Sequence, residues 1–400
     1  MKPFKLSNDL FWLGALDPNL RVFDIIMKTE FGTTYNAYLL KGSQKTVLFE
    51  TVKYQYVDEY LRNLSTLTAI DKIDYLVVNH TEPDHSGSIE RLLELNPNLT
   101  IIGTASGIKF LTQIVNRDFK AIIVGDNDTL SLGNRTMRFF PLPNLHWPDT
   151  MFTYIEEDHT LVTCDAFGCH YCFDGILLSK ITNQTDYQKA LKFYFDMIIA
   201  PFRHPFVTNA LKRIEGLPIG MILTGHGPVL DIDIKTIIDQ YQKWSLDYSP
   251  FTKPSVVIAY VSAYGYTKAL AMAIAKGVLA SGDIDVRIHD MGEADAVNVL
   301  NEIAYCDGVL LGTPTMVGEA LKPIWDLTSS MVASIHGKKP GGAFGSYGWS
   351  GEGVPHIIER LKQLNMKVDD GLRVRFKPTS ADLETAEKYG FNFGNQILNK

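Results

Sequence analysis

The stretch His80-Thr81-Glu82-Pro83-Asp84-His85 directly follows residues 73–79, a short apolar run typical of a buried strand. It places four potential metal ligands within six residues, a density that packing alone does not explain. Alternate side chains of an extended loop point the same way, so we expect His80, Glu82 and Asp84 to converge on one place. The sequence therefore predicts a metal site at the end of this strand.

Three further candidate ligands stand in similar contexts at predicted strand ends. They are His146 in Leu145-His146-Trp147-Pro148-Asp149, Asp165 in Cys164-Asp165-Ala166-Phe167-Gly168, and His226 in Thr224-Gly225-His226-Gly227-Pro228. Together with His80, Glu82 and Asp84 they offer three imidazoles and three carboxylates. Such a set is sufficient for two metal ions that share one bridging carboxylate.

Length and composition predict a globular protein of two domains. The chain has 400 residues, of which 46% are hydrophobic and 21% are charged. Its net charge of −7 argues against a nucleic-acid partner, which requires a basic face. No apolar stretch approaches the roughly 18 residues of a membrane span. The polar N-terminus and the four cysteines predict a cytoplasmic protein without a disulfide scaffold.

Patterns along the chain separate the two domains. The first half has short β-rich runs at residues 34–40, 46–49 and 73–79, and a helix over residues 89–95 that ends before Pro97. Residues 248–254 contain two prolines and are interpreted as the linker. We therefore expect one domain over residues 1–249 and a second over residues 254–400.

Strands alternate with helices after the linker. The predicted strands cover residues 256–261, 285–288, 308–312 and 342–345, and a predicted helix covers residues 268–279. This alternation predicts an α/β domain with a doubly wound parallel sheet. Such a sheet binds its ligands at the loops beyond the carboxyl ends of the strands.

The order of the ligand motifs resembles that of the flavodiiron proteins, also called A-type flavoproteins, a branch of the metallo-β-lactamase fold. The resemblance rests on His-x-Glu-x-Asp-His at residues 80–85, Leu-His-Trp-Pro-Asp at 145–149, Asp-Ala-Phe-Gly at 165–168 and Gly-His-Gly at 225–227. It implies an N-terminal metallo-β-lactamase-like αββα sandwich. Any one of these histidines could be a structural loop residue, but six residues that match in type, order and spacing argue against that interpretation.

The same resemblance implies a non-haem diiron site. One iron would be held by His80, Glu82 and His146, and the other by Asp84 and His226, with Asp165 bridging the two. Zinc hydrolases of this fold have a histidine at the position of Glu82, whereas a carboxylate-rich site without a thiolate suits iron in oxygen chemistry. His85 is carried over as a group close to the metals that does not ligate them.

Four other residues stand outside the six-ligand set: His170, Cys169, Cys172 and Asp24. His170 follows Asp165 by five residues, as a histidine does in family members, and is either a candidate for proton supply or a structural histidine. Cys169-His170-Tyr171-Cys172 has the C-x-x-C spacing of zinc-binding and redox motifs. The chain has no second cysteine pair for a zinc site and no thioredoxin-like context around this pair, so we reject both interpretations. Family members commonly have glutamine at the position of Cys169, and many have histidine at that of Asp24. Because Asp24 departs from this pattern, the substrate preference of relatives is not carried over to this chain.

Three loops in the second half resemble the flavin-binding loops of flavodoxins. They are Ser262-Ala263-Tyr264-Gly265-Tyr266-Thr267, Thr313-Pro314-Thr315-Met316 and Ser346-Tyr347-Gly348-Trp349-Ser350-Gly351. The first resembles a phosphate loop, with Tyr264 as a departure, and it lacks the Gly-Lys-Ser/Thr ending of a nucleoside triphosphate site. We therefore expect a flavodoxin-like domain that binds FMN, with Trp349 against the flavin rather than in the core.

For the activity, the resemblance implies reduction of dioxygen to water, of nitric oxide to nitrous oxide, or of both. Dioxygen reduction needs four electrons, of which two ferrous ions supply two and reduced FMN supplies the others. Family members place the flavin of one subunit beside the diiron site of another, so we expect a head-to-tail homodimer or a dimer of dimers. The chain has no rubredoxin-type cysteine pairs, which predicts a separate electron donor such as a rubredoxin or a reductase.

Two other functions compete with this one. The first is a zinc-dependent hydrolase fused to a flavodoxin-like module, against which Glu82 argues. The second is a non-catalytic electron carrier whose N-terminal domain serves only for docking. The complete set of six ligands argues against a carrier, because a docking platform has no need of them.

Overall fold

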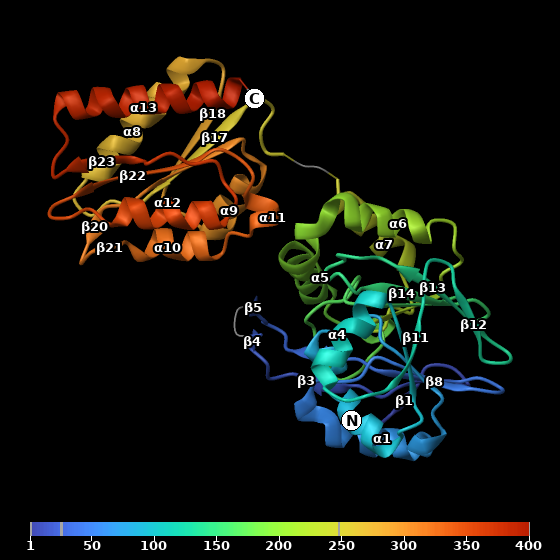
Figure 1. Ribbon diagram of the computed structural model, residues 1–400. Coiled ribbons are helices and arrows are strands. Elements are labelled where there is room, and N and C mark those ends of the chain that lie inside the picture. The colour runs from blue at the N-terminus through green and yellow to red at the C-terminus, as the bar shows by residue number, and fades with distance from the viewer. Residues whose placement is uncertain (1, 25–26, 247–248, 400) are drawn as a thin grey trace. The chain divides into compact units, whose positions relative to one another are not determined.

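The computed structural model describes residues 2–24, 27–246 and 249–399, which form two compact units that divide after Leu246 (Figure 1). The predicted linker includes Tyr248, which lies outside the described residues, and the predicted domain limits at residues 249 and 254 stay predictions. Within the described ranges, no helix combines the length and the apolar character needed to span a membrane.

Two β-sheets form the centre of the first unit. The larger sheet has the order β1 (Phe4–Lys5), β2 (Leu10–Trp12), β7 (Tyr38–Lys41), β8 (Thr46–Phe49), β9 (Tyr75–Val77), β10 (Thr100–Gly103) and β11 (Lys120–Ile123). The smaller sheet has the order β12 (Thr129–Ser131), β13 (Thr136–Pro141), β14 (Met151–Ile155), β15 (Thr160–Cys164) and β16 (Met221–Thr224). Apolar side chains of both sheets, among them Phe49, Phe139 and Leu223, pack into one core.

Helices cover the outer faces of both sheets. The larger sheet packs against α1 (Val57–Leu67), α3 (Ile89–Leu95) and α4 (Ala105–Val115), and the smaller one against α5 (Gln184–Tyr194), α6 (Thr208–Ile214) and α7 (Ile234–Trp244). In β8, Leu48 faces the helices whereas its neighbour Phe49 faces the other sheet. Burial on both faces explains why these strands are continuously apolar. The predicted αββα sandwich and the predicted helix over residues 89–95 are confirmed.

Shorter elements complete the first unit. They are β3 (Ala15–Asp17), β4 (Val22–Phe23), β5 (Met27–Lys28), β6 (Thr33–Tyr35) and α2 (Pro83–Ser86), with short 3₁₀ or π turns at Tyr54–Tyr56, Ile70–Lys72, Leu178–Lys180, Phe195–Ile199, Ala200–Phe202 and Arg203–Val207. The β-rich run predicted over residues 34–40 is divided between two strands, because β6 pairs with β3 and β7 joins the larger sheet. Asn36 lies at the break, where its side-chain amide donates to the carbonyls of Thr224 (3.0 Å) and Gly227 (2.9 Å).

The second unit has one parallel sheet. Its order is β18 (Asp285–Asp290), β17 (Ser255–Tyr260), β19 (Gly308–Gly312), β22 (Gly341–Tyr347) and β23 (Leu372–Arg375), and β20 (Thr315–Met316) and β21 (Glu319–Ala320) form a separate hairpin. The four predicted strands are confirmed. The prediction missed β23, because only Val374 of its four residues is buried and the pattern is not that of a core strand.

Helices cover both faces of this sheet, as Figure 1 shows. One face packs against α8 (Tyr266–Ser281) and α13 (Ser380–Leu398), and the other against α9 (Ala296–Tyr305), α10 (Lys322–Ser329) and α12 (Gly353–Gln363), with α11 (Ala333–His336) beyond them. The strand order reverses between β17 and β19. Ligands of doubly wound sheets bind beyond the carboxyl ends of the strands at such a switch point, and the three predicted flavin loops follow β17, β19 and β22.

Candidate metal centre and flavin pocket

Four loops bring the six predicted ligands together at one edge of the two sheets. The loop after β9 carries the residues from His80 to His85, and the connection from β13 to β14 carries His146. Asp165 directly follows β15, whose pairing with β16 shifts between Val162 and Cys164. His226 lies just beyond the end of β16. The ligands are therefore attached to strand ends that the sheets hold in place.

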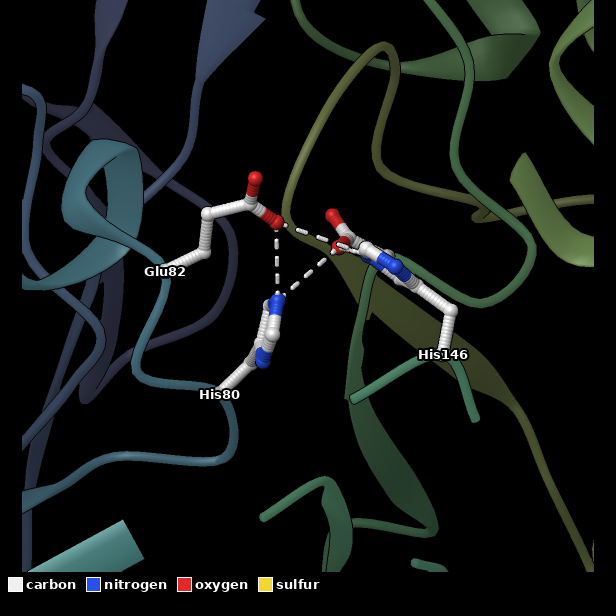
Figure 2. A group of neighbouring side chains, drawn as sticks. His80, Glu82 and His146 are labelled. Atoms are coloured by element: carbon white, nitrogen blue, oxygen red, sulfur yellow. Dashed lines mark hydrogen bonds and ion pairs between the residues drawn. The ribbon is translucent and has the colours of Figure 1, made fainter. Parts of the chain in front are cut away.

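His80, Glu82 and His146 form the first ligand group with one oxygen of Asp165. The Nε2 of His80 lies 3.0 Å from Glu82 Oε2 and 3.5 Å from Asp165 Oδ2. The Nε2 of His146 lies 2.8 Å from Asp165 Oδ2 and 3.5 Å from Glu82 Oε2. Figure 2 shows the side chains of His80, Glu82 and His146 directed toward one point. Two imidazoles and one carboxylate are the set that non-haem iron(II) enzymes use.

Asp84, His85 and His226 form the second ligand group around the other oxygen of Asp165. The Nε2 of His226 lies 3.0 Å from Asp84 Oδ2 and 3.6 Å from Asp165 Oδ1. The Nε2 of His85 lies 3.3 Å and 3.2 Å from the same two oxygens. Distance therefore does not separate His85 from His226, and the absence of His85 from the ligand set stays a prediction.

Asp165 connects the two groups, because Oδ2 faces His80 and His146 whereas Oδ1 faces His85 and His226. The expectation that His80, Glu82 and Asp84 converge was wrong in one respect. Pro83 begins the helical turn α2, so the chain is not extended there and Asp84 joins the second group.

A cavity of about 510 Å³ lies at the carboxyl ends of β17, β19 and β22. Its lining includes thirteen predicted flavin residues: Ser262, Ala263, Tyr264, Tyr266, Thr267, Pro314, Thr315, Met316, Ser346, Tyr347, Gly348, Trp349 and Ser350. Gly265, Thr313 and Gly351 lie in the same loops but do not line it, and Val317, Gly318 and Phe376 line it without having been predicted. Trp349 is 88% exposed and so lies outside the core.

Known proteins resemble the chain over its whole length. Residues 33–227 match the family model described as ODP family beta lactamase, and residues 258–390 match that of flavodoxin. Flavo-diiron protein FprA2 of Clostridium acetobutylicum is 42% identical over 405 residues, which cover 99% of this chain and 100% of that protein. Type A flavoprotein fprA of Rhodobacter capsulatus is 37% identical, with coverage of 100% and 92%. The chain belongs to the flavodiiron protein family.

Solved structures give the same result for the fold of this flavodiiron protein. Rubredoxin oxygen:oxidoreductase from the anaerobe Desulfovibrio gigas matches with a TM-score of 0.71 at 28% identity, covering 100% of this chain and 99% of that one. The flavodiiron protein from Giardia intestinalis matches with a TM-score of 0.69 at 27% identity, with coverage of 100% and 97%. A metallo-β-lactamase-like domain followed by a flavodoxin-like domain is thus the fold of the chain.

Hydrogen bonds orient two of the predicted ligand histidines of this flavodiiron protein. The Nδ1–H of His226 donates to the carbonyl oxygen of Thr34 at 2.5 Å, which leaves Nε2 to face Asp84. The Nδ1 of His80 lies 3.4 Å from Asp149 Oδ2, an oxygen that also accepts from the backbone N–H of Thr81 at 2.6 Å. Carboxylate and carbonyl partners of this kind fix the tautomer of metal-binding histidines. Asp149 ends the motif at residues 145–149, but no role was predicted for it from the sequence.

Opposite charges dominate the electrostatics of the ligand groups. Burial by itself lowers the pKa of His85, but the carboxylates of Asp84 and Asp165 raise it to about 9. Burial by itself raises the pKa of Asp84, but His85 and His226 lower it to about 2. These shifts show that the centre strongly favours cations beside its carboxylates, a preference that metal ions also satisfy.

The buried polar atoms fit a metal centre. Among the described residues, Asp84 Oδ1 and Oδ2, Asp165 Oδ1 and His85 Nε2 are buried without a hydrogen bond of normal geometry. Buried polar atoms usually have a partner, and metal coordination provides one. The Cys164 thiol also lies near His85 and Asp165, and burial raises its pKa well above the ordinary value. The six predicted ligands themselves offer only imidazole and carboxylate donors.

The four other residues that the sequence singled out are His170, Asp24, Cys169 and Cys172, and each has a shifted pKa. The His170 ring is 5.1 Å from that of His226, its Nδ1 is 2.9 Å from Thr33 Oγ1, and burial lowers its pKa well below the ordinary value. Burial and the charge of Asp84 raise the pKa of Asp24, whose Oδ1 is 3.6 Å from the ammonium of Lys53. Cys169 and Cys172 are free thiols, and burial raises the pKa of both.

Proposed function

We propose that this flavodiiron protein reduces dioxygen to water, nitric oxide to nitrous oxide, or both, with electrons that pass through FMN to a non-haem diiron site. The observation that carries the proposal is Asp165, whose two carboxylate oxygens face two separate ligand groups. A carboxylate whose two oxygens face separate ligand groups is expected in a site for two metal ions.

The residues would divide as follows. His80, Glu82 and His146 would hold one iron, and Asp84 and His226 the other, with Asp165 shared and His85 beside the pair. When bound, the two irons supply the site of substrate reduction and FMN supplies stored electrons. The carboxylate of Glu82, at a position where zinc hydrolases of this fold have a histidine, favours iron in oxygen chemistry.

The residues around the ligands control water and protons. The side chains of His80, His85, Asp84, Asp165 and His226 are each at most 4% exposed, whereas those of Glu82 (20%) and His146 (15%) are more accessible. A small substrate would therefore enter from the side of Glu82 and His146. The buried Nε2 of His170 has no hydrogen-bond partner among the described residues, so His170 is well placed to exchange protons beside His226.

FMN would occupy the cavity of the flavodoxin-like domain. Its volume is in the range of small-molecule sites. Tyr266 and Thr267, in the first turn of the 16-residue helix α8, line it, and helix N-termini favour phosphate groups. The exposed side chains of Tyr264, Val317 and Trp349 surround the cavity and suit a contact with another subunit. A head-to-tail homodimer or a dimer of dimers would place this cavity beside a partner's ligand groups.

The electron donor would be a separate protein. The name of the Desulfovibrio gigas relative assigns a rubredoxin to that protein. For this chain we propose a rubredoxin or a reductase as donor.

The first experiment is to measure metal and flavin in protein produced with added iron. We expect about two irons and about one FMN per chain, the content that two ligand groups and one cavity allow. Zinc in place of iron under iron-rich conditions would instead support the hydrolase.

Activity needs a separate measurement. The anaerobically reduced protein, mixed with dioxygen or with nitric oxide, should reoxidise its flavin rapidly, and dioxygen should yield no peroxide. Slow reoxidation with stoichiometric peroxide would contradict the proposal and favour the electron carrier.

A further inference from the structure

The end of β23 is bound to residues 346–351, called here the flavin loop. Tyr347 and Arg375 are register partners in the parallel pair of β22 and β23. The backbone N–H of Phe376 donates to the Tyr347 carbonyl at 2.7 Å, and Arg375 Nε donates to the Gly348 carbonyl at 3.2 Å. Two successive residues at the end of β23, Arg375 and Phe376, therefore hold the backbone of the flavin loop by hydrogen bonds.

The ring of Phe376 supports the loop directly. A Cβ atom at Gly348 would lie only 3.0 Å from Phe376 Cε1, so the glycine backbone rests against the ring edge. The ring also lines the flavin cavity, together with Tyr347 and Trp349. One aromatic side chain thus contacts the loop and faces the ligand space.

Phe376 has an unusual backbone for its position. Its φ of +56° lies in the left-handed region, which aromatic side chains seldom adopt. Phe376 is 54% exposed, so its packing within this chain offsets only part of the free-energy cost of the left-handed backbone. Strained residues gather at ligand sites, and a planar ligand in the cavity would cover the exposed part of the ring.

We propose that Phe376 is an aromatic contact for the flavin ring and that Arg375 is a positioning residue, which holds the Gly348 carbonyl and with it the flavin loop. The inference rests on the proposed function, in which the cavity binds FMN. It adds a fourth segment, from the fifth strand of the sheet, to the three loops that the sequence identified.

Titration of FMN into the flavin-free full-length protein, followed by flavin fluorescence, tests the role of Phe376. We expect Phe376→Ala and Phe376→Gly to weaken FMN binding about tenfold, the upper end of what one aromatic contact contributes. Phe376→Tyr keeps the ring and should bind within about threefold of the original protein. Phe391 on α13 is also an exposed phenylalanine (41%) and lies outside the cavity, so Phe391→Ala is the matched control.

Thermal unfolding without FMN separates contact from structure. Glycine adopts φ near +56° without strain, so Phe376→Gly should not lower the Tm although it weakens FMN binding. A Tm lowered in parallel with FMN affinity would overturn the contact role. Unchanged affinity in both Phe376→Ala and Phe376→Gly would also overturn it, whereas failure of the original chain to bind FMN would overturn the proposed function instead.

Arg375 has a matched control on the same strand. Arg375→Ala removes the bond to the Gly348 carbonyl, whereas the side chain of Arg373 is exposed and donates no hydrogen bond to the flavin loop among the described residues. We expect a loss of about threefold to tenfold in FMN affinity for Arg375→Ala and none for Arg373→Ala. Equal effects of the two substitutions would show that general positive charge, and not this hydrogen bond, assists FMN binding.

Discussion

At the scale of single residues, Asp165 is the side chain on which both ligand groups depend. Each of its oxygens lies within 3.6 Å of two histidines, and its side chain is 4% exposed. Four histidines therefore lose a neighbouring carboxylate when this one side chain is removed. No other predicted ligand contacts both groups through different oxygens.

Asp165→Ala should lower iron content to below about one per chain and turnover by about 100-fold or more, because it removes one carboxylate oxygen from each ligand group. FMN content should not change, since the flavin cavity is in the other unit. Elemental analysis and oxygen consumption measure the two effects. Asp174→Ala is the control, because Asp174 is an exposed aspartate nine residues away. Turnover retained in Asp165→Ala would rule out a diiron mechanism.

His336 gives the flavodoxin-like unit a dependence on pH. Burial lowers the pKa of His336 to about 4, and its Nδ1 accepts from the backbone N–H of Val332 at 2.9 Å. An unfolded histidine titrates near 6.5, so the unfolded state takes up the proton first as the pH falls. Stability is therefore unaffected above about pH 6.5 and falls progressively down to about pH 4, by about 2–3 kcal/mol in total.

His336→Asn should remove this part of the pH dependence, because asparagine offers an acceptor at the position of Nδ1 and does not titrate. Pulse proteolysis in urea at pH 7.5 and at pH 5 reports the folded fraction of the second unit in both proteins. The same decrease in both proteins would assign the effect to another group.

At the scale of elements, strand ends and helix ends position the functional loops. The first flavin-binding loop lies between β17 and α8, and the following crossovers depend on α9 and α12. Lys339 is buried just before β22 and satisfies the end of α9. Its ammonium donates to the carbonyls of Ile303 (2.6 Å), Ala304 (3.2 Å) and Cys306 (2.7 Å). A cation at this helix end also interacts favourably with the helix dipole.

Lys339→Met should destabilise the second unit by about 1.5–3 kcal/mol, because methionine fills similar space but leaves these carbonyls without a charged donor. Lys338→Met is the matched control, since Lys338 is the exposed neighbour. Pulse proteolysis again reads the stability of the unit. A smaller loss for Lys339→Met than for Lys338→Met would contradict the capping role.

At the scale of the whole molecule, a head-to-tail dimer predicts complementation between two inactive variants. Asp165→Ala lacks the diiron site but keeps the flavin. Ser262→Asp should lack the flavin, because Ser262 lines the cavity beside the α8 N-terminus and a carboxylate there repels phosphate while still favouring the helix. Each variant alone should be nearly inactive.

Co-production of the two variants should restore about a quarter of the original turnover. Random association makes half of the dimers mixed. Each mixed dimer has one complete pair of flavin and diiron site, whereas a dimer of the original protein has two. Oxygen consumption measures the activity, and sedimentation confirms that dimers are present. Dimers without restored activity would show that flavin and iron cooperate within one chain.

The doubly wound parallel sheet could be predicted from local patterns and the αββα sandwich from the resemblance of the ligand motifs, and the errors have physical reasons. The strands between two packed layers are apolar throughout, and Gly308–Gly312 was predicted with its observed limits. The strand β23 was missed because exposed Arg373 and Arg375 alternate with buried Val374 at the sheet edge. The loop after β9 was given an extended conformation, although proline at the first helical position is a frequent helix start.

The sequence by itself determined the chemistry of this protein: which side chains are available, in which order, and at the ends of which strands. Residue type and local periodicity carry that information, because ligand atoms and strand propensity belong to short segments. Only the tertiary structure decided that Asp149 supports His80, that Lys339 caps the end of α9, and that Phe376 joins the flavin cavity. These relations connect segments far apart in the chain, and their distances are fixed by how the sheets pack and by strand register, which no local pattern specifies.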